Sequence, residues 1–382
     1  MGPTILLSAG EPSGDLHGAA LARALRARWP QARLYGLGGP LMAAAGVELL
    51  ADFHDLAVMG FAEVAGRIPF FLRLLRRVRG ELRARGTALV VPIDYPGFNM
   101  RLAKAARAEA VPVLYYIAPQ VWAWHRSRIR QLARLADRLA VILPFEEVIF
   151  REAGANVRFV GHPLLDASPP PSRERVRQER GVADGPVLAI FPGSRRQEVA
   201  KHLGLFAEAA ERVRAAAPDV QPIVARSPAV PAAMYAGAPF EQTTDGRALL
   251  ARARAALVKS GTTTLEAALA GTPMVIAYRT SSLTFALAKR LVRVEHIGLV
   301  NLVAGVRLVP EFVQHEARPG ALAEAVRPFL APGPARDAVV NGLARVREAL
   351  RAPAGPAGAP TTTAERVTAL AGELLGREPA DA

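Results

Sequence analysis

The chain has 382 residues, enough for two domains, and 51% of them are hydrophobic, so each domain can bury a core of its own. The chain contains no cysteine, which excludes disulfide bonds, thiolate metal sites and cysteine nucleophiles. The formal net charge of +14 favours an anionic partner: a nucleic acid, an anionic membrane surface or a phosphorylated substrate. Because no zinc-finger spacing, RNP signature or aromatic-basic stripe occurs, we predict no nucleic-acid partner.

The start of the chain and its apolar runs bear on localisation. Met1 leads almost directly into a strand-like run, without the basic and apolar segments of a signal peptide. No apolar run reaches the roughly 18 residues that a membrane-spanning helix needs. We therefore expect a cytoplasmic protein that is not integral to the membrane.

Apolar runs alternate with helical patterns through the first half of the chain. The runs span residues 4–8, 34–37, 89–93, 113–117, 139–143 and 157–160. Continuous apolar strands separated by helices are typical of a parallel sheet that is covered on both faces. A Pro-rich stretch at 168–172 reads as a stiff linker, so the first domain is expected to span residues 1–167.

The second half repeats this organisation. Strand-like runs at 187–191, 222–225, 255–258 and 274–277 predict another doubly wound sheet, in a domain of residues 173–345. Residues 346–382 are expected to form a linker, rich in Pro, Gly and Ala at 352–360, and a last helix at 362–375 that packs back on the N-terminal domain. The predicted fold class is α/β, with two doubly wound Rossmann-like domains facing across a ligand-binding cleft.

The segment SAGEPSGDLHG, residues 8–18, joins the first strand to a helix expected at 19–28. A strand, a glycine-containing turn and a helix form a common ligand site, because the amides at the helix N-terminus favour anions. The spacing is not that of a dinucleotide-binding G-x-G-x-x-G motif. In the alternative interpretation, Ser13 or Asp15 simply caps the helix.

The segment PIDYPGFN, residues 92–99, places Asp94 at the carboxyl end of the strand at 89–93. Pro96 and Gly97 require a tight turn there. A partly desolvated carboxylate at this position is suited to act as a general base on a hydroxyl group. In the alternative interpretation, Asp94 caps a helix that begins near Asn99.

Three further segments of the first half carry two interpretations each. Trp122, next to Trp124 and His125, lines an acceptor pocket or belongs to the core, and His162 reaches into the cleft or satisfies a loop carbonyl. Residues 66–85 interleave Phe and Leu with seven arginines. This pattern is typical of a helix on an anionic bilayer, or of a core-packed helix with a basic outer face.

Two turns of the second domain have the composition of a nucleotide-diphosphate site. FPGSRRQE, residues 191–198, offers helix amides beside Arg195 for a diphosphate, with Gly193 and Ser194 in the turn. VKSGTTTLE, residues 258–266, offers hydroxyl groups and a carboxylate for a ribose. The predicted residues of this second turn are Ser260, Gly261, Thr262 and Glu266.

These motifs resemble those of the lipid-A-disaccharide synthase family and follow one another in the same order as in that family, from about Leu6 to about Val309. Five further segments share the resemblance: VMGFAEV, LPFE, VGHPLLD, TPMVIAYR and HIGLVNLVAG. The resemblance implies a GT-B fold and a glycosyltransferase at the inner face of the cytoplasmic membrane. Such an enzyme moves 2,3-diacylglucosamine from UDP to the 6-hydroxyl of 2,3-diacylglucosamine 1-phosphate. The linkage is β-1,6, formed with inversion, and no metal or other cofactor is implied. The alternative is another UDP-sugar enzyme of the same fold, a peptidoglycan precursor transferase or a UDP-GlcNAc 2-epimerase.

The resemblance also implies roles for individual residues. Asp94 matches the general base, Arg195 the arginine at the UDP phosphate, and Asn301 an asparagine needed for activity. It also implies a homodimer that exchanges C-terminal segments. Glu11, Ser13 and Asp15 match the N-terminal loop at the cleft. Together with the interpretations above, the predicted cleft and acceptor residues are Glu11, Ser13, Gly14, Asp15, His17, Trp122 and His162. Those implied at the membrane and the acyl chains are Phe61, Phe70, Phe71, Leu72, Leu74 and Leu75.

Overall fold

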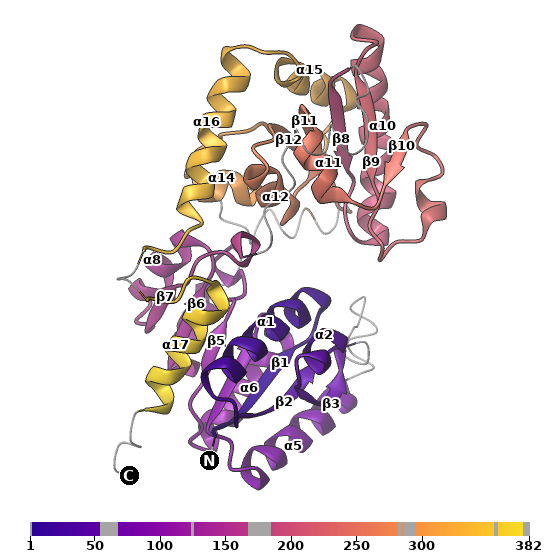
Figure 1. Cartoon of the computed structure of the whole chain (residues 1–382). Helices are drawn as coiled ribbons and strands as arrows, with labels where there is room; N and C mark the ends of the chain where they lie inside the picture. Colours follow the sequence, from indigo (N-terminus) through magenta and orange to yellow (C-terminus); the bar gives the residue numbers. More distant parts are fainter. Residues whose placement is uncertain are drawn as a thin grey trace. The chain divides into compact units, whose positions relative to one another are not determined.

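The computed structural model describes residues 2–53, 68–123, 126–166, 185–281, 285, 295–354 and 358–376. The chain divides into two compact units (Figure 1). Unit 1 comprises Met1–Asp166 and Arg351–Ala382, and unit 2 comprises Ala167–Leu350. Each unit has its own parallel sheet with helices on it.

Unit 1 contains a seven-stranded parallel sheet with the strand order β3-β2-β1-β4-β5-β6-β7. The order reverses between β1 and β4, which pair in register with Ser8 opposite Pro92 and Ala9 opposite Ile93. The carboxyl ends of these two strands therefore lie side by side, at the position where open α/β sheets bind ligands. The strands are β1 (Thr4–Ala9), β2 (Arg33–Gly38), β3 (Glu48–Asp52), β4 (Leu89–Ile93), β5 (Leu114–Tyr116), β6 (Arg138–Val141) and β7 (Val157–Phe159).

The first helix of unit 1 begins earlier than the sequence predicts. Helix α1 starts at Pro12, not at residue 19, since a proline fits the first helical position. Glu11 occupies the N-cap without a side-chain hydrogen bond, so neither Ser13 nor Asp15 caps the helix. The helices of this unit are α1 (Pro12–Arg28), α2 (Pro40–Ala44), α5 (Ile68–Ala84), α6 (Pro96–Ala108), α7 (Arg126–Leu135), α8 (Pro144–Glu152) and α17 (Thr363–Leu375).

Helix α17 belongs to unit 1 although it lies at the other end of the sequence (Figure 1). It packs against α1, and its residues Val367, Leu370, Ala371 and Leu374 enter the same core as the β1 and β4 side chains. At its start, the amide of Thr363 donates to Asp166 Oδ2 at 2.8 Å. The C-terminal segment thus covers one face of the unit 1 sheet.

Unit 2 contains a six-stranded parallel sheet with the order β10-β9-β8-β11-β12-β13. The order reverses between β8 and β11, so the carboxyl ends of these strands form the second expected ligand position. The strands are β8 (Val187–Phe191), β9 (Gln221–Ala225), β10 (Glu241–Thr243), β11 (Ala255–Lys259), β12 (Met274–Tyr278) and β13 (Glu311–Val313). The helices are α10 (Arg196–Ala216), α11 (Gly246–Arg252), α12 (Thr263–Leu269), α14 (Leu299–Ala304), α15 (Pro319–Leu330) and α16 (Pro334–Ala349).

Candidate active site

Asp94 follows directly after β4, in a turn of unusual backbone geometry. Its φ is 46° and that of Tyr95 is 49°, both in the left-handed region. Helix α6 begins at Pro96 with Tyr95 at the N-cap, and no side chain makes a capping hydrogen bond. The alternative that Asp94 caps a helix beginning near Asn99 is therefore wrong.

The surroundings of Asp94 make its carboxyl group more basic than usual. Burial and the negative charge of Glu11 raise its pKa from 3.8 to about 6, although a hydrogen bond from the Tyr95 amide opposes the rise. A carboxyl group with this pKa is ionised at neutral pH and is still a useful proton acceptor. Its position and basicity suit a general base.

A second carboxyl group near Asp94 belongs to Glu146, which is fully buried and to which the sequence motifs assign no role. It accepts hydrogen bonds from Trp122 Nε1 at 2.9 Å and from the amide of Leu143 at 3.2 Å. Burial raises its pKa to about 7, and the charge of Asp94 contributes to the rise. Trp122 is only 8% exposed and packs edge-on against Phe145, so it belongs to the core that supports the site. The sequence does contain one sign of this role of Glu146: it is the third residue of α8, where a glutamate commonly accepts from the N-cap amide.

His17 and His162 lie near each other and are neutral at physiological pH. Burial lowers both pKa values to about 4, and the charge on His17 lowers that of His162 further. Nδ1 of His162 accepts from the amide of Leu164 at 3.2 Å, so it satisfies a loop amide and not the carbonyl that we considered. The His17 ring meets Tyr116, the last residue of β5, edge-on. Neither histidine presents a positive charge to a phosphate.

The acidic residues of the first turn have different surroundings. Asp15 is 2% exposed, and its carboxylate accepts from the amides of Gly39, Leu41 and Met42 at 2.8–3.0 Å. These three amides open α2, so Asp15 fixes the β2–α2 connection and has no oxygen that faces solvent. Glu11 and Ser13 are exposed, while Gly14 is buried against Ala9. Of Glu11, Ser13 and Asp15, therefore, Glu11 and Ser13 can offer polar side chains to a ligand.

Helix α5 buries one side and exposes the other. Leu74, Val78 and Leu82 are at most 6% exposed, so Leu74 is a core residue and is not available to a bilayer. Leu72 is 50% exposed, while Phe70, Phe71 and Leu75 are half-buried and the Phe71 ring contacts Phe98 of α6. Phe61, like Trp124 and His125, lies outside the described residues.

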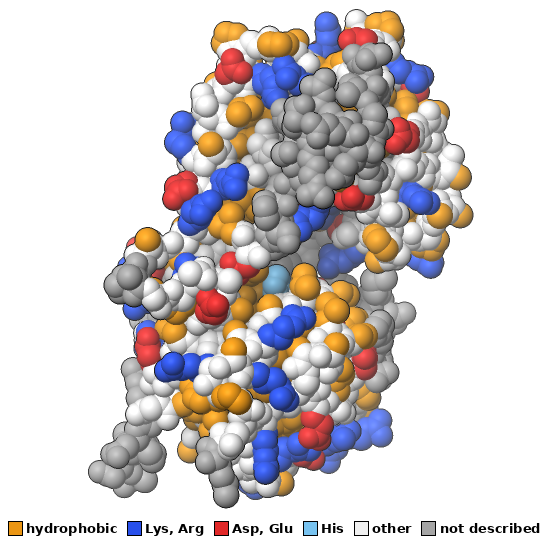
Figure 2. All heavy atoms as spheres, viewed as in Figure 1, with side chains coloured by type: hydrophobic (Ala, Val, Ile, Leu, Met, Phe, Trp, Pro, Cys, Tyr) orange, Lys and Arg blue, Asp and Glu red, His pale blue; other side chains and the backbone are white. Residues whose placement is uncertain are grey.

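The arginines of α5 divide into two groups along the helix. Arg79 and Arg83 pair with Glu109, and Arg85, which directly follows the helix, pairs with Glu48 and Glu81. Within the part of the chain that the structure describes, Arg73 and Arg76 in the first half of the helix have no acidic partner. Figure 2 shows Lys and Arg side chains gathered along the edge of unit 1 where α5 lies in Figure 1. Among the described residues, no helix combines the length and the hydropathy needed to span a bilayer.

In unit 2, the side-chain carboxylate of Glu198 occupies the position predicted for the diphosphate of the ligand. Glu198 Oε2 accepts from the amides of Ser194 at 2.9 Å and Arg195 at 3.3 Å, and Lys259 Nζ lies 2.8 Å from Oε1. Burial would raise the pKa of Glu198, but the hydrogen bond and charge of Lys259 outweigh it and lower the pKa. The amides of Ser194 and Arg195, which directly precede α10, are therefore engaged. The Arg195 side chain is 63% exposed, 3.7 Å from Glu198 Oε1.

The second turn of unit 2 follows β11. Ser260 Oγ donates to the carbonyl of Ile297 at 2.7 Å, which ties this turn to the segment before α14. Thr262 is exposed and Gly261 is half-buried. Burial raises the pKa of Glu266, opposed by a hydrogen bond with Thr263 and the charge of Arg247. Both predicted turns of this unit thus lie at the carboxyl ends of β8 and β11, which are neighbouring strands.

Asn301 is completely buried in α14. Its Nδ2 donates to the carbonyl of Val309 at 2.9 Å and to Glu311 Oε1 at 2.8 Å, and its Oδ1 accepts from the amide of Val309 at 3.0 Å. The side chain is 0% exposed, so it holds the connection between α14 and β13 without a surface for a ligand.

Replacing Asn301 with alanine should therefore lower the free energy of unfolding by about 1–3 kcal/mol, because Glu311 and the Val309 backbone lose buried partners. Denaturant unfolding followed by circular dichroism measures the change. The matched control is Asn341→Ala on the exposed face of α16, which should change stability by less than about 0.5 kcal/mol. Equal stability of the two variants would contradict the supporting role of Asn301.

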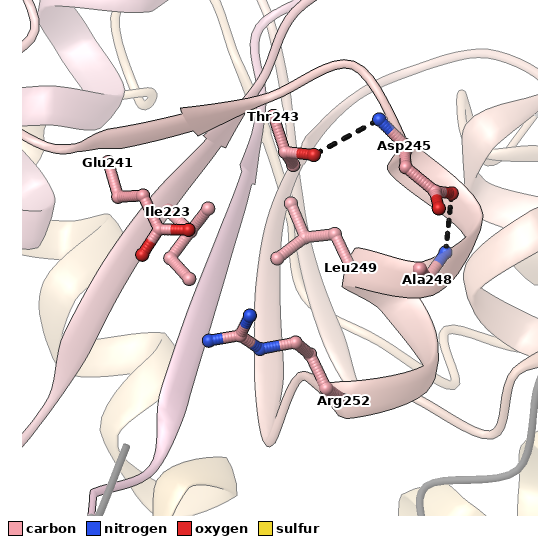
Figure 3. Close-up of a pocket in the computed structure, with 7 residues that line it drawn as sticks. All are labelled: Ile223, Glu241, Thr243, Asp245, Ala248, Leu249 and Arg252. Atoms are coloured by element: carbon pink, nitrogen blue, oxygen red, sulfur yellow. Dashed lines mark hydrogen bonds between the residues drawn. The ribbon is translucent and has the colours of Figure 1, made fainter. Parts of the chain in front are cut away.

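A small depression lies elsewhere on unit 2, between β9, β10 and α11 (Figure 3). One wall contains Asp245, whose carboxylate accepts from the amide of Ala248 and so caps α11. The lining residues are Ile223, Glu241, Thr243, Asp245, Ala248, Leu249 and Arg252. None of them is a predicted site residue, so the depression adds nothing to the candidate site.

Comparisons with solved structures identify the fold. The calicheamicin glycosyltransferase CalG4 superposes with a TM-score of 0.62 at 18% identity, over 98% of this chain and 99% of that one. The glycotransferase of kitacinnamycin gives a TM-score of 0.65 at 18% identity, over 98% and 100% of the two chains. At this identity the likeness concerns the fold alone, and it confirms the predicted GT-B class.

Comparisons of sequence identify the family. The family model for lipid-A-disaccharide synthetase matches residues 5–347. The lipid-A-disaccharide synthase of Myxococcus xanthus is 41% identical over 377 residues, which cover 96% of this chain and 97% of that protein. The one of Geobacter sulfurreducens is 40% identical over 383 residues, which cover 98% of each. Since both the family model and these relatives span nearly all of its length, the chain belongs to the lipid-A-disaccharide synthetase family.

Proposed function

We propose that the protein condenses UDP-2,3-diacylglucosamine with 2,3-diacylglucosamine 1-phosphate to a β-1,6-linked lipid A disaccharide 1-phosphate and releases UDP. The observation that carries this proposal is Asp94, a half-buried carboxyl group with a pKa of about 6 at the carboxyl end of β4, beside the strand-order reversal of unit 1. Family membership supports the choice of substrates.

The proposed reaction is a single displacement with inversion. Asp94 accepts the proton of the acceptor 6-hydroxyl while that oxygen forms a bond to the anomeric carbon of the donor. The bond from the anomeric carbon to the phosphate oxygen breaks, and its electron pair leaves with UDP. A general base of this kind contributes about 10²–10⁴-fold to the rate.

The leaving diphosphate needs positive charge, which unit 2 supplies. Because Glu198 engages the amides of Ser194 and Arg195, we assign the phosphate contact to the Arg195 guanidinium and not to these amides. Glu266 and Thr262 remain the proposed partners of the ribose. Asn301 and Asp15 act as supports of their turns, since their polar atoms are engaged within the protein.

We also propose that the first half of α5 lies against the anionic inner face of the cytoplasmic membrane. The support is the combination of exposed Leu72 with Arg73 and Arg76, which have no acidic partner among the described residues. Apolar side chains flanked by unneutralised arginines favour an anionic lipid surface. A homodimer that exchanges C-terminal segments stays a prediction.

The proposal is tested by turnover of UDP-2,3-diacylglucosamine and diacylglucosamine 1-phosphate in detergent, read by mass spectrometry. We expect the disaccharide 1-phosphate and one equivalent of UDP. Unacylated UDP-GlcNAc should be neither transferred nor epimerised. Epimerisation of UDP-GlcNAc, or transfer without an acyl requirement, would overturn the proposal in favour of another UDP-sugar enzyme of this fold.

The pH dependence of turnover should report the ionisation of Asp94. Only the ionised carboxylate accepts a proton, so kcat should rise as the pH increases through about 6 and then level off. Glu11→Gln removes a negative charge that raises this pKa. In this variant the rise of kcat with pH should therefore occur at lower pH than in the wild type.

The control is Glu152→Gln at the exposed end of α8, in which kcat should rise over the same pH range as in the wild type. Steady-state kinetics of the three proteins across the acidic range measure the effect. If the rise of kcat shifted to the same extent in both variants, the assignment of this pKa to Asp94 would be contradicted.

A further inference from the structure

The backbone at Asp94 is held in a disfavoured conformation. Asp94 and Tyr95 both have a left-handed φ, which residues other than glycine adopt at an energetic penalty. Among the described residues, they form the only adjacent pair of non-glycine residues with positive φ. Such geometry persists only where neighbouring groups fix it.

Two buried side chains fix this turn by converging on one atom. The carbonyl oxygen of Asp94 accepts from Asn99 Nδ2 at 2.8 Å and from the Tyr115 hydroxyl at 2.8 Å. Asn99 and Tyr115 are each 0% exposed, and they come from α6 and β5. The peptide that follows Asp94 is thereby clamped from two sides.

Asn99 also connects this turn to the end of β1. Its Oδ1 accepts from Ser8 Oγ at 2.6 Å, and its Nδ2 is 3.0 Å from the Ser8 carbonyl. Beside Ser8, Gly10 leaves room for the Tyr95 ring, since a Cβ on Gly10 would lie 2.3 Å from that ring. The two sequence motifs that flank the strand reversal are therefore interlocked through Asn99 and Tyr95.

We propose that Asn99 and Tyr115 are positioning residues for the glycosyl transfer, which hold the Asp94 carbonyl so that its side chain keeps a fixed direction toward the acceptor hydroxyl. The inference rests on the proposed function, because it assigns these residues to the base of that reaction. Neither side chain has exposed surface with which to touch a substrate. Any effect that they have on the transfer is therefore indirect, through the turn that carries Asp94.

The first test compares two variants that each lose one buried hydroxyl. Tyr115→Phe removes a donor to Asp94, whereas Tyr35→Phe removes a hydroxyl that bonds Thr87 elsewhere in unit 1. The two should lose similar thermal stability. Only Tyr115→Phe should lower kcat, by about 10- to 100-fold as expected for a misplaced catalytic group, with KM unchanged for both substrates.

The second test is a double-mutant cycle with Asp94→Asn. If Tyr115 acts through the carboxylate, Tyr115→Phe should cause little further loss of kcat in the Asp94→Asn background. Asn99→Asp replaces the amide donor by an acceptor and should reduce kcat more than Tyr115→Phe. If this variant does not fold, the Tyr115 cycle still decides the question.

The outcomes separate the two proposals. If the wild-type protein forms no disaccharide, the proposed function fails and the inference fails with it. If the wild type is active and Tyr115→Phe retains its kcat, or slows the Asp94→Asn protein by the same factor as the wild type, only the positioning role is overturned.

Discussion

Asp94→Asn should reduce turnover by about 10²–10⁴-fold while leaving UDP binding intact, because the amide cannot accept the proton of the acceptor hydroxyl. The substitution keeps the size of the side chain, and the Arg195 turn belongs to the other unit. Product formation by mass spectrometry and UDP affinity by calorimetry measure the two quantities. An Asp94→Asn protein with wild-type turnover would exclude this residue as the base.

The same substitution should not weaken the fold. Folding raises the pKa of Asp94 from 3.8 to about 6, so the folded state is destabilised at pH values at which this carboxyl group is ionised. Each unit of pKa corresponds to about 1.4 kcal/mol, so the penalty reaches roughly 3 kcal/mol above pH 6. This penalty disappears as the pH falls below the unfolded value. Asp94→Asn should therefore melt at or above the wild-type temperature at pH 8, and the difference should shrink toward pH 4. A large loss of stability at pH 8 would indicate a structural role instead.

The central strands were predictable because both of their faces are buried. The apolar runs at 89–93 and 187–191 coincide with β4 and β8. The three strands that the sequence did not reveal, β3, β10 and β13, all lie at sheet edges. An edge strand is short and partly exposed, as in Glu241–Thr243, and so lacks the continuous apolar run of a buried strand.

The position of Asp94 at a strand end was predictable, but the contacts within the candidate site were not. Asp94 could be placed because a strand end is visible in the sequence. The hydrogen bonds of Asp15 with the amides at the start of α2, and of Glu198 with the amides of Ser194 and Arg195 before α10, depend on where short connections fold back. The proximity of Glu146 to Asp94 likewise joins residues from separate strands and helices. Such contacts follow from the tertiary structure and leave only a weak local signal.

Helix α17 links the C-terminus to the site in unit 1. Val367 is 0% exposed in a core that also contains Ile93 and Tyr116, the residues at the ends of β4 and β5 beside Asp94. A change in this helix should therefore reach the candidate base, although the two are far apart in the sequence.

Val367→Asp should destabilise unit 1 by about 4 kcal/mol or more and abolish turnover, since it places an unpaired charge in this core. The matched control is Ala369→Asp on the exposed side of the same helix, which should change stability by at most about 0.5 kcal/mol. Thermal melts and the turnover assay compare the two, and equal melting temperatures would contradict the packing. The melts also test the exchange of segments. An α17 packed within its own chain gives a melting temperature independent of protein concentration, whereas an α17 supplied by a second subunit makes it rise with concentration.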